Sequence, residues 1–171
     1  MAASFEVLPG LPGDGPYPEQ FTTAGGTHRE GFVVRVLPER GPPWVGNFQR
    51  GLGTFSGVMW HPGGRLLLVI AHGQAYLVDP ESRRLASTPF DGISGVLEAS
   101  GWVILASFTD LMILSPHGGQ WVSPRVAWDG IRNVRIEGGR LLGDGWSAVL
   151  DAWRPFEIDL ETRQVVTSAY D

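Results

Sequence analysis

Cysteine and lysine are both absent from this chain of 171 residues. Without cysteine the protein has no disulfide framework, no thiolate metal site and no cysteine nucleophile. All 13 basic residues are arginine, which we attribute to GC-rich codon usage rather than to selection for guanidinium groups. Because 18 acidic residues bring the net charge to −5, a broad phosphate-binding surface is disfavoured and we expect no nucleic acid partner.

Long hydrophobic runs and the common nucleotide-binding motifs are missing as well. The segment 1–20 has neither a basic start nor an apolar core of signal-peptide length, and no later run approaches a membrane span. No phosphate-binding G-x-x-x-x-G-K-[ST] or G-x-G-x-x-G motif and no G-x-S-x-G elbow occurs. We therefore expect a soluble cytoplasmic protein that contacts no membrane and carries no cofactor.

Glycine and proline, by contrast, are abundant, at 24 and 13 residues. Together with the scarcity of long helical runs they indicate many tight turns, and the predicted fold class is all-β. Seven tryptophans need large buried or half-buried surfaces. The length suits a single domain.

A repeat of about forty residues organises the chain. Three segments resemble one another: LGTFSGV (52–58), FDGISGV (90–96) and WDGIRNV (128–134). Within them Phe55, Ile93 and Ile131 are evenly spaced, since 93 − 55 = 38 and 131 − 93 = 38. Equal spacing at this period indicates a structural repeat, with the three segments as joints between successive units.

Each unit is expected to form three or four short antiparallel strands. In the first complete unit the strands a, b, c and d are predicted near residues 55–60, 65–71, 74–78 and 83–87. Asp79 and Asp159 follow the c strands and are expected to cap turns through their side chains. Meanders of this kind have their a–b and c–d turns at one end, and their b–c and d–a connections at the other.

The predicted boundaries give about three and a half units. The chain is divided into a Pro/Gly-rich N-terminal arm (1–29), a half unit (30–51) and three units (52–89, 90–127 and 128–171). The arm holds Pro9, Pro12, Pro16 and Pro18, so we expect neither a regular helix nor a central strand in it. The third unit carries an insertion, because Gly139 to Asp159 spans 20 positions where Gly64 to Asp79 spans 15.

With these residues in view, the units resemble blades of β-propeller repeat proteins of the WD-repeat or quinoprotein-like kind. WHPGGRLLLVIAHGQAYLVDPES (60–82) is similar to an a–b turn, an apolar b strand and a c strand, and FEIDLETR (156–163) repeats the last part. The WDGIR and IDLET patterns also resemble an uncharacterised bacterial family. The Trp128–Asp129 pair departs from the family pattern, because it lies in a d–a joint and not at the end of strand c.

Three and a half blades are too few to close a ring, since closed propellers use about four to eight. The sequence therefore predicts either a homo-oligomer, a dimer, in which two chains complete one another, or a β-sandwich or open β-stack. Unpaired strand edges have to be covered in either case, and the arm is a candidate for covering one of them.

The b–c and d–a end of the repeats is where propellers most often bind ligands, and it collects the most polar turns. The candidates for ligand or partner contact are His72, Gln74, Asp91, Asp110, Trp128, Asp129, Asp144, Trp146 and Trp153. Asp144 and Trp146 are assigned here to the longer b–c turn of the third unit. Acids beside tryptophan faces suit a sugar, a cationic peptide or a hard metal ion.

A purely structural explanation competes at most of these positions. Asp91 and Asp129 precede glycines, and Asp-Gly is a common turn dipeptide. The four histidines lack zinc-ligand spacing, so we expect no metal site and assign no catalytic residue. Most tryptophans are expected between sheets, whereas Trp146 and Trp153, beside Val149 and Leu150, are nominated for an exposed contact patch.

We predict a non-enzymatic protein-interaction or ligand-binding module for a protein partner or a small polar ligand. It would act through the rim formed by the b–c and d–a loops and through the insertion of the third unit. One alternative is a small hydrolase or lyase that uses His72 with Asp110, Asp129 or Asp144. Another is an immunity-type protein that neutralises a basic partner by charge complementarity.

Overall fold

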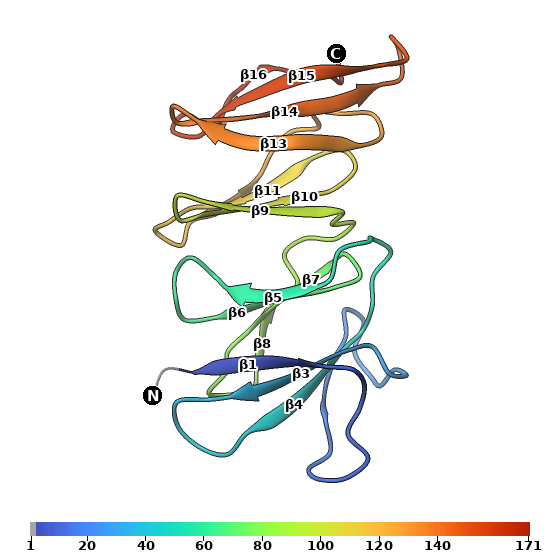
Figure 1. Cartoon of the computed structure of the whole chain (residues 1–171), viewed down its shortest axis with the longest axis vertical. Coiled ribbons are helices and arrows are strands. Elements are labelled where there is room, and N and C mark those ends of the chain that lie inside the picture. Colours follow the sequence, from blue (N-terminus) through green and yellow to red (C-terminus); the bar gives the residue numbers. More distant parts are fainter. Residues whose placement is uncertain (1–2) are drawn as a thin grey trace. The chain divides into compact units, whose positions relative to one another are not determined.

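The computed structural model describes residues 3–171 and consists of β-strands joined by turns and loops (Figure 1). In this part of the chain sixteen strands form four sheets of four strands each, which confirms the predicted all-β, repeat-like fold class. The chain divides into two compact units, unit 1 (1–92) and unit 2 (93–171), each with two sheets. No helix long and apolar enough to cross a bilayer occurs among the described residues.

The first sheet of unit 1 uses the N-terminal segment as two edge strands. Its strands are β1 (Ser4–Leu8), β2 (Glu19–Phe21), β3 (Phe32–Leu37) and β4 (Trp44–Phe48), in the order β1-β3-β4-β2. β1 pairs antiparallel with β3, whereas β2 pairs parallel with β4. The expected half unit is thus completed by the predicted arm, which covers both edges of one hairpin, and the chain has four sheets in place of three and a half units.

The second sheet of unit 1 follows the expected meander. It contains β5 (Gly57–Trp60), β6 (Leu67–Ala71), β7 (Gln74–Val78) and β8 (Leu85–Ser87), paired in chain order. These bounds agree with the four strands predicted from the sequence. β6 is buried at every position, as its unbroken apolar run LLVIA indicates for a strand covered on both faces.

The two sheets of unit 1 share one hydrophobic core. Val34, Val36 and Phe48 of the first sheet belong to the same buried cluster as Val69 and Tyr76 of the second. Phe48 also stacks on Phe21, with ring centroids 4.5 Å apart. Val34 and Val36 lie two residues apart on β3, so they face the same side of the strand and enter this core together.

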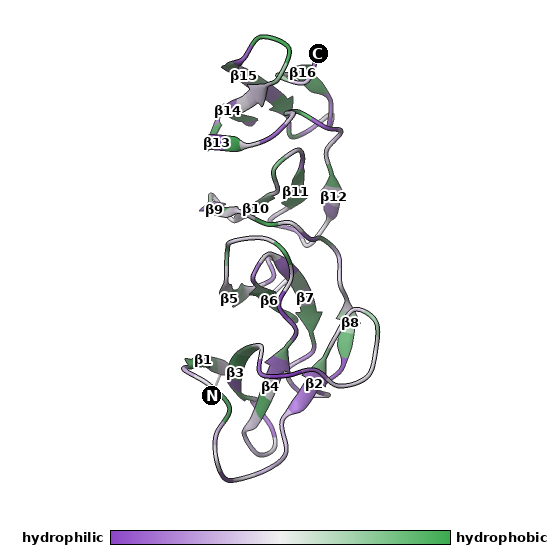
Figure 2. Cartoon of the chain, turned by 90° about the vertical axis from the view of Figure 1, so that its right-hand side faces the viewer, coloured by the Kyte–Doolittle hydropathy of each residue, from purple (hydrophilic) through white to green (hydrophobic). Residues whose placement is uncertain are grey.

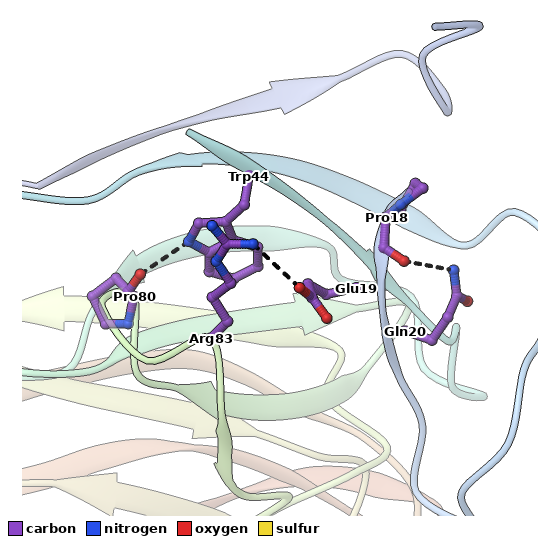
Figure 3. A network of polar contacts seen from close by, with 6 residues as sticks. All are labelled: Pro18, Glu19, Gln20, Trp44, Pro80 and Arg83. Atoms are coloured by element: carbon purple, nitrogen blue, oxygen red, sulfur yellow. Dashed lines mark hydrogen bonds and ion pairs between the residues drawn. The ribbon is translucent and has the colours of Figure 1, made fainter. Parts of the chain in front are cut away.

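Polar contacts fasten β2 and β4 to the turn that follows β7 (Figure 3). Trp44 Nε1 donates a hydrogen bond to Pro80 O at 2.9 Å, and Arg83 Nη1 lies 3.4 Å from Glu19 Oε1. The ring of Trp44 is itself part of the core, so its N–H needs a partner there. Pro80 O supplies that partner, so the buried indole N–H is satisfied.

Unit 2 contains two further meanders. The first is β9 (Gly95–Ala99), β10 (Trp102–Ala106), β11 (Leu111–Leu114) and β12 (Gln120–Val122). The second is β13 (Ile131–Glu137), β14 (Arg140–Ser147), β15 (Ala152–Asp159) and β16 (Val165–Thr167). Ile104, Ile113, Leu141, Phe156 and Ile158 form the centre of the shared core of this unit.

The insertion predicted in the third repeat lengthens two strands and also the turn between them, which comprises residues 148–151 where the β6–β7 turn comprises only 72–73. β14 and β15 each have eight residues, and their ladder continues to the pair Ser147 and Ala152. The assignment of Asp144 and Trp146 to a b–c turn is therefore wrong, because both lie within β14. The sequence alternation Leu141, Gly143, Gly145 on the buried face carries the strand through this segment.

Two c–d turns have the same pair of hydrogen bonds to an aspartate, at the positions where the sequence predicts aspartate caps. Asp79 Oδ1 accepts hydrogen bonds from Glu81 N at 2.9 Å and Ser82 N at 3.0 Å. Asp159 Oδ1 accepts the corresponding bonds from Glu161 N at 3.0 Å and Thr162 N at 2.8 Å. These backbone donors hold the pKa of both carboxyl groups below the ordinary value.

Candidate functional site

Residues 51–56, which include most of the first joint (52–58), are held tightly against the turn between β6 and β7. Gly51 N donates to Ala71 O at 2.9 Å, and Gly53 N donates to His72 O at 2.9 Å. In return, Gly73 N donates to Phe55 O at 2.7 Å. We call this surface, with the segment 88–91 that follows β8, the unit-1 rim.

Leu52 stands out from this rim with its side chain 100% exposed. The hydrogen bonds of its two neighbours fix the backbone on either side, so the leucine is presented on a rigid loop. Gly51 cannot be replaced without a clash, because a Cβ there would come within 2.8 Å of Gln74 Cβ and 2.9 Å of His72 O. A single exposed leucine is common on protein surfaces, so Leu52 gains meaning only from the polar residues around it.

His72 lies in the same turn and is engaged by the joint. It adopts a left-handed conformation, with φ of 44°, and Gly73 follows with φ of 82°, as a two-residue hairpin turn requires. Ser56 Oγ accepts a hydrogen bond from His72 N at 2.9 Å and lies 3.2 Å from His72 Nδ1. In the described part of unit 1 the imidazole thus contacts a hydroxyl and not an acid.

Gln74 and Asp91, both predicted contact residues, come together at a cavity of about 360 Å³ in the rim. The cavity is lined by Thr23, Gln74, Thr88, Pro89, Phe90 and Asp91. β7 supplies the glutamine, the segment after β8 supplies residues 88–91, and the loop after β2 supplies Thr23. Segments about fifty residues apart in the sequence therefore form one site.

Hydrogen-bond acceptors dominate this cavity. Gln74 Nε2 donates to Ala75 O at 3.1 Å and to Phe90 O at 3.2 Å, so its amide hydrogens are used within the protein. Gln74 Oε1 and the Asp91 carboxylate are left to accept bonds from a ligand. Because Asp91 is the one charged residue in the lining and Phe90 adds an aromatic ring, the cavity suits a cationic, donor-rich group.

Asp110 in unit 2 serves a turn. Its Oδ1 accepts hydrogen bonds from the Ser107 hydroxyl and from Thr109 Oγ1 at 3.3 Å. Ser107 Oγ in turn accepts from Thr109 N and Asp110 N, each at 3.1 Å. The carboxylate is thus built into the loop between β10 and β11.

Trp128 forms a clasp with the C-terminal segment. Its Nε1 donates to Tyr170 O at 3.0 Å, and the two rings lie 4.7 Å apart. The Arg125 guanidinium lies over both rings, 5.5 Å from Trp128 and 4.8 Å from Tyr170. The adjacent Asp129 is exposed on the loop. Contacts within the protein therefore explain the tryptophan at position 128.

Trp146 and Trp153 meet on the exposed face of the last sheet. They are directly opposed in the β14–β15 ladder and their rings make an edge contact at 5.5 Å. The Arg132 guanidinium lies 4.0 Å from the Trp153 ring centre. Asp144 Oδ2 accepts a hydrogen bond from Asn133 Nδ2 at 2.7 Å and lies 3.8 Å from Arg132 Nε.

Sequence reasoning missed several residues of these surfaces. Leu52, Thr23 and Thr88 carry no local signal, because their roles depend on which segments fold beside them. The exposure of Val149 and Leu150 was predicted and is confirmed. Among residues 3–171 no group of three or more His, Asp or Glu side chains is arranged to hold a metal ion.

Comparison with protein-family models and with curated proteins finds no match to this chain.

Proposed function

We propose that this protein is a non-catalytic binding module, and that the unit-1 rim binds a basic segment of a protein partner. The observation that carries the proposal is the convergence of Gln74 and Asp91 on one acceptor-rich cavity, where Gly51, the residue before the exposed Leu52, packs against Gln74. A lysine or arginine side chain of the partner enters the cavity and donates to Gln74 Oε1 and Asp91. The neighbouring apolar residue of the partner packs on Leu52.

Rigidity of the rim favours binding over catalysis. The joint and the β6–β7 turn are cross-linked by backbone hydrogen bonds of 2.7 to 2.9 Å, so little conformational entropy is lost when a partner docks. The enzymatic alternative pairs His72 with an aspartate, whereas its Nδ1 lies 3.2 Å from the Ser56 hydroxyl. A basic partner is also what the immunity-type alternative requires, and the proposal adds where the contact is made.

The propeller-like character of the repeats is part of the same proposal. It is supported by the three sheets that pair in chain order and by the three joints that resemble one another in sequence. In each of these sheets the b–c turn and the d–a joint lie at the same end, as the rim requires. Blades of this kind commonly present binding loops at one end.

The test uses a fluorescein-labelled peptide of alternating arginine and glycine, with a serine–glycine peptide of equal length as the neutral probe. Fluorescence anisotropy is measured at low and at high salt. We expect the basic peptide to bind, the neutral one not to bind, and binding to weaken as salt rises. Asp91→Asn, which keeps the shape of the side chain and removes its charge, should abolish most of this binding.

Asp129→Asn is the matched control. Asp129 is also an exposed acid in an Asp-Gly joint, but it belongs to unit 2 and lies outside this cavity. Equal effects of the two substitutions would reduce the binding to general attraction by an acidic protein and would refute the proposed site. Binding of the neutral peptide at similar affinity would refute the choice of a basic partner.

A further inference from the structure

The turn between β14 and β15 presents an apolar tip. It comprises residues 148–151, in which Val149 is 70% and Leu150 is 56% exposed. Its apolar character is visible in Figure 2 as the green loop beside β15. The ladder reaches Ser147 and Ala152, directly beside the turn, so the tip is carried on a regular hairpin. We call residues 148–151 the hairpin tip.

An apolar slot of about 290 Å³ lies in the same unit, between β9, β10 and β13. Ile104 and Ala106 form its buried floor, and Leu97 and Ile131 line it with half-buried side chains. A Cβ built on Gly95, at the edge of the slot, meets no atom within 4 Å. The slot is therefore open at Gly95 and large enough for a leucine side chain.

The slot carries a positive group at its mouth. Arg132 lines it, and its side chain is 50% exposed. The Nε of Arg132 faces Asp144 at 3.8 Å, which leaves the Nη edge of the guanidinium to meet a second carboxylate. The hairpin tip supplies such a carboxylate, because Asp151 directly follows Leu150 and is exposed.

Tip and slot lie at the same end of unit 2. Ile131, the first residue of β13, pairs with Gly145 near the end of β14, and Arg132 stacks on Trp153 near the start of β15. Two copies facing each other across a twofold axis beside Trp153 can therefore exchange tips. Such an arrangement is closed, since each copy supplies one tip and receives one.

We propose that this end of unit 2 is a self-association site, in which the hairpin tip of one copy fills the slot of a second copy. Leu150 packs on the half-buried Leu97 and Ile131 of the partner copy, and Asp151 pairs with Arg132 at the mouth. The charge of the unit disfavours a lipid surface as the occupant. Unit 2 has six arginines and ten acids, so its net charge is 6 − 10 = −4, and anionic headgroups would be repelled.

The contact area of one tip is small, so we expect a dimer that dissociates on dilution. Two reciprocal contacts in one dimer reinforce each other, because forming the first brings the second into register. Loss of both tips, or of both slots, should therefore remove the dimer altogether. Loss of one tip and one slot should leave a single contact.

The experiment uses full-length protein and measures solution mass by light scattering over a dilution series. Val149→Ser with Leu150→Ser removes the apolar tip, and Gly95→Leu fills the slot from a position with room for the side chain. Val166→Ser on β16 is the matched control, because Val166 is 56% exposed, as Leu150 is. Circular dichroism and a thermal melt confirm that each variant folds.

We expect wild type and the Val166 variant to dimerise, and the tip and slot variants to be monomers. An equimolar mixture of the tip and slot variants should regain dimer, because the intact tip of one fits the intact slot of the other. In a dimer of either variant alone, both contacts are impaired, because every tip is altered in the tip variant and every slot is filled in the slot variant. Sedimentation velocity with a fluorescent label on one variant detects the mixed species.

A wild type that stays monomeric at every concentration would overturn the proposal. So would a dimer that survives the tip substitutions, or a mixture that remains monomeric while both variants are folded. Should Gly95→Leu fail to fold, the tip variant still decides the matter, because its substituted side chains are exposed. In that case labelled wild type is mixed with increasing amounts of the tip variant. The labelled protein should then form dimers that dissociate more easily, because a mixed dimer keeps only one of the two contacts.

Discussion

Replacing Gly145 by alanine should destabilise unit 2, because the C-terminal segment and residues 126–127, which lead into the third joint, both pack against this glycine. A Cβ on Gly145 would lie 2.8 Å from Ala127 Cβ, 2.9 Å from Ala169 Cβ and 2.9 Å from Val126 O. The two facing segments are tied to each other, since Ala169 N donates to Val126 O at 3.0 Å. The alanine therefore pushes against backbone and short side chains that cannot rotate away.

The variant Gly95→Ala measures how a glycine-to-alanine change alters the free energy of unfolding where the new methyl group meets no clash. Gly95 is also a strand residue of unit 2, and a Cβ there meets no atom within 4 Å. Both substitutions reduce the freedom of the unfolded chain by the same amount, about 0.4 to 1 kcal/mol in favour of folding. The difference between the variants thus isolates the steric cost, which for overpacking is about 1 to 3 kcal/mol.

Urea unfolding followed by tryptophan fluorescence gives both free energies of unfolding. Five of the seven tryptophans belong to unit 2, so its transition dominates the signal. We expect Gly95→Ala at or above wild-type stability, and Gly145→Ala below it by about 1 to 2 kcal/mol. If the Gly145 variant proved as stable as the Gly95 variant, the close packing of residues 126–127 and the C-terminal segment against β14 would be refuted.

Three further predictions concern buried and capping groups. Tyr76→Phe should lower the free energy of unfolding by about 1 kcal/mol, because Tyr76 donates to Gln49 O at 2.7 Å and burial raises its pKa to about 12; an unchanged urea midpoint would contradict this. Asp79→Ala should cost about 1 kcal/mol and Asp79→Asn much less, since the amide oxygen still accepts from the turn. The pKa of Asp79 is lowered in the fold, so its contribution is complete above about pH 3.8 and is lost as pH falls through the lower folded value, which urea titrations at acidic pH would register. Burial lowers the pKa of His61, whose Nε2 has no partner among the described residues while its Nδ1 accepts from Gly63 N at 3.0 Å. The stability that the neutral ring preserves is therefore complete above about pH 6.5 and declines as pH falls below it, and His61→Asn should flatten the melting-temperature profile between about pH 7 and 5; parallel profiles would rule out this role for His61.

Local patterns in the sequence were enough to predict the strands of the best-formed repeat. The run LLVIA, the Asp-Pro turn after it and the turn before Gln74 are signals that act within a few residues. Asp79 and Asp159 were identified as turn caps for the same reason, because an aspartate bonds its own turn. The exposed position of Val149 and Leu150 could be predicted because they lie in the insertion of the third unit, beside Trp146 and Trp153.

The failures lie where the deciding contact is distant in sequence. The segment before residue 30 was expected to form an arm that could cover a strand edge, but its pairing partners β3 and β4 and the parallel direction of one pairing were not predicted. Asp144 was assigned to a turn because length alone does not distinguish a longer loop from two longer strands. Only the ladder between β14 and β15 distinguishes them.

The sequence by itself determined the all-β class, the 38-residue period and the residue types that gather at the joints, because strand alternation and turn chemistry are short-range properties. The tertiary structure alone decided which of those residues share a site. Gln74 and Asp91 meet Thr23 because β2 pairs along β4, and the slot beside Arg132 exists because β9 and β13 pack side by side. Cavities and exposed anchors are made by pairings between strands far apart in the chain, and no local pattern encodes such pairings.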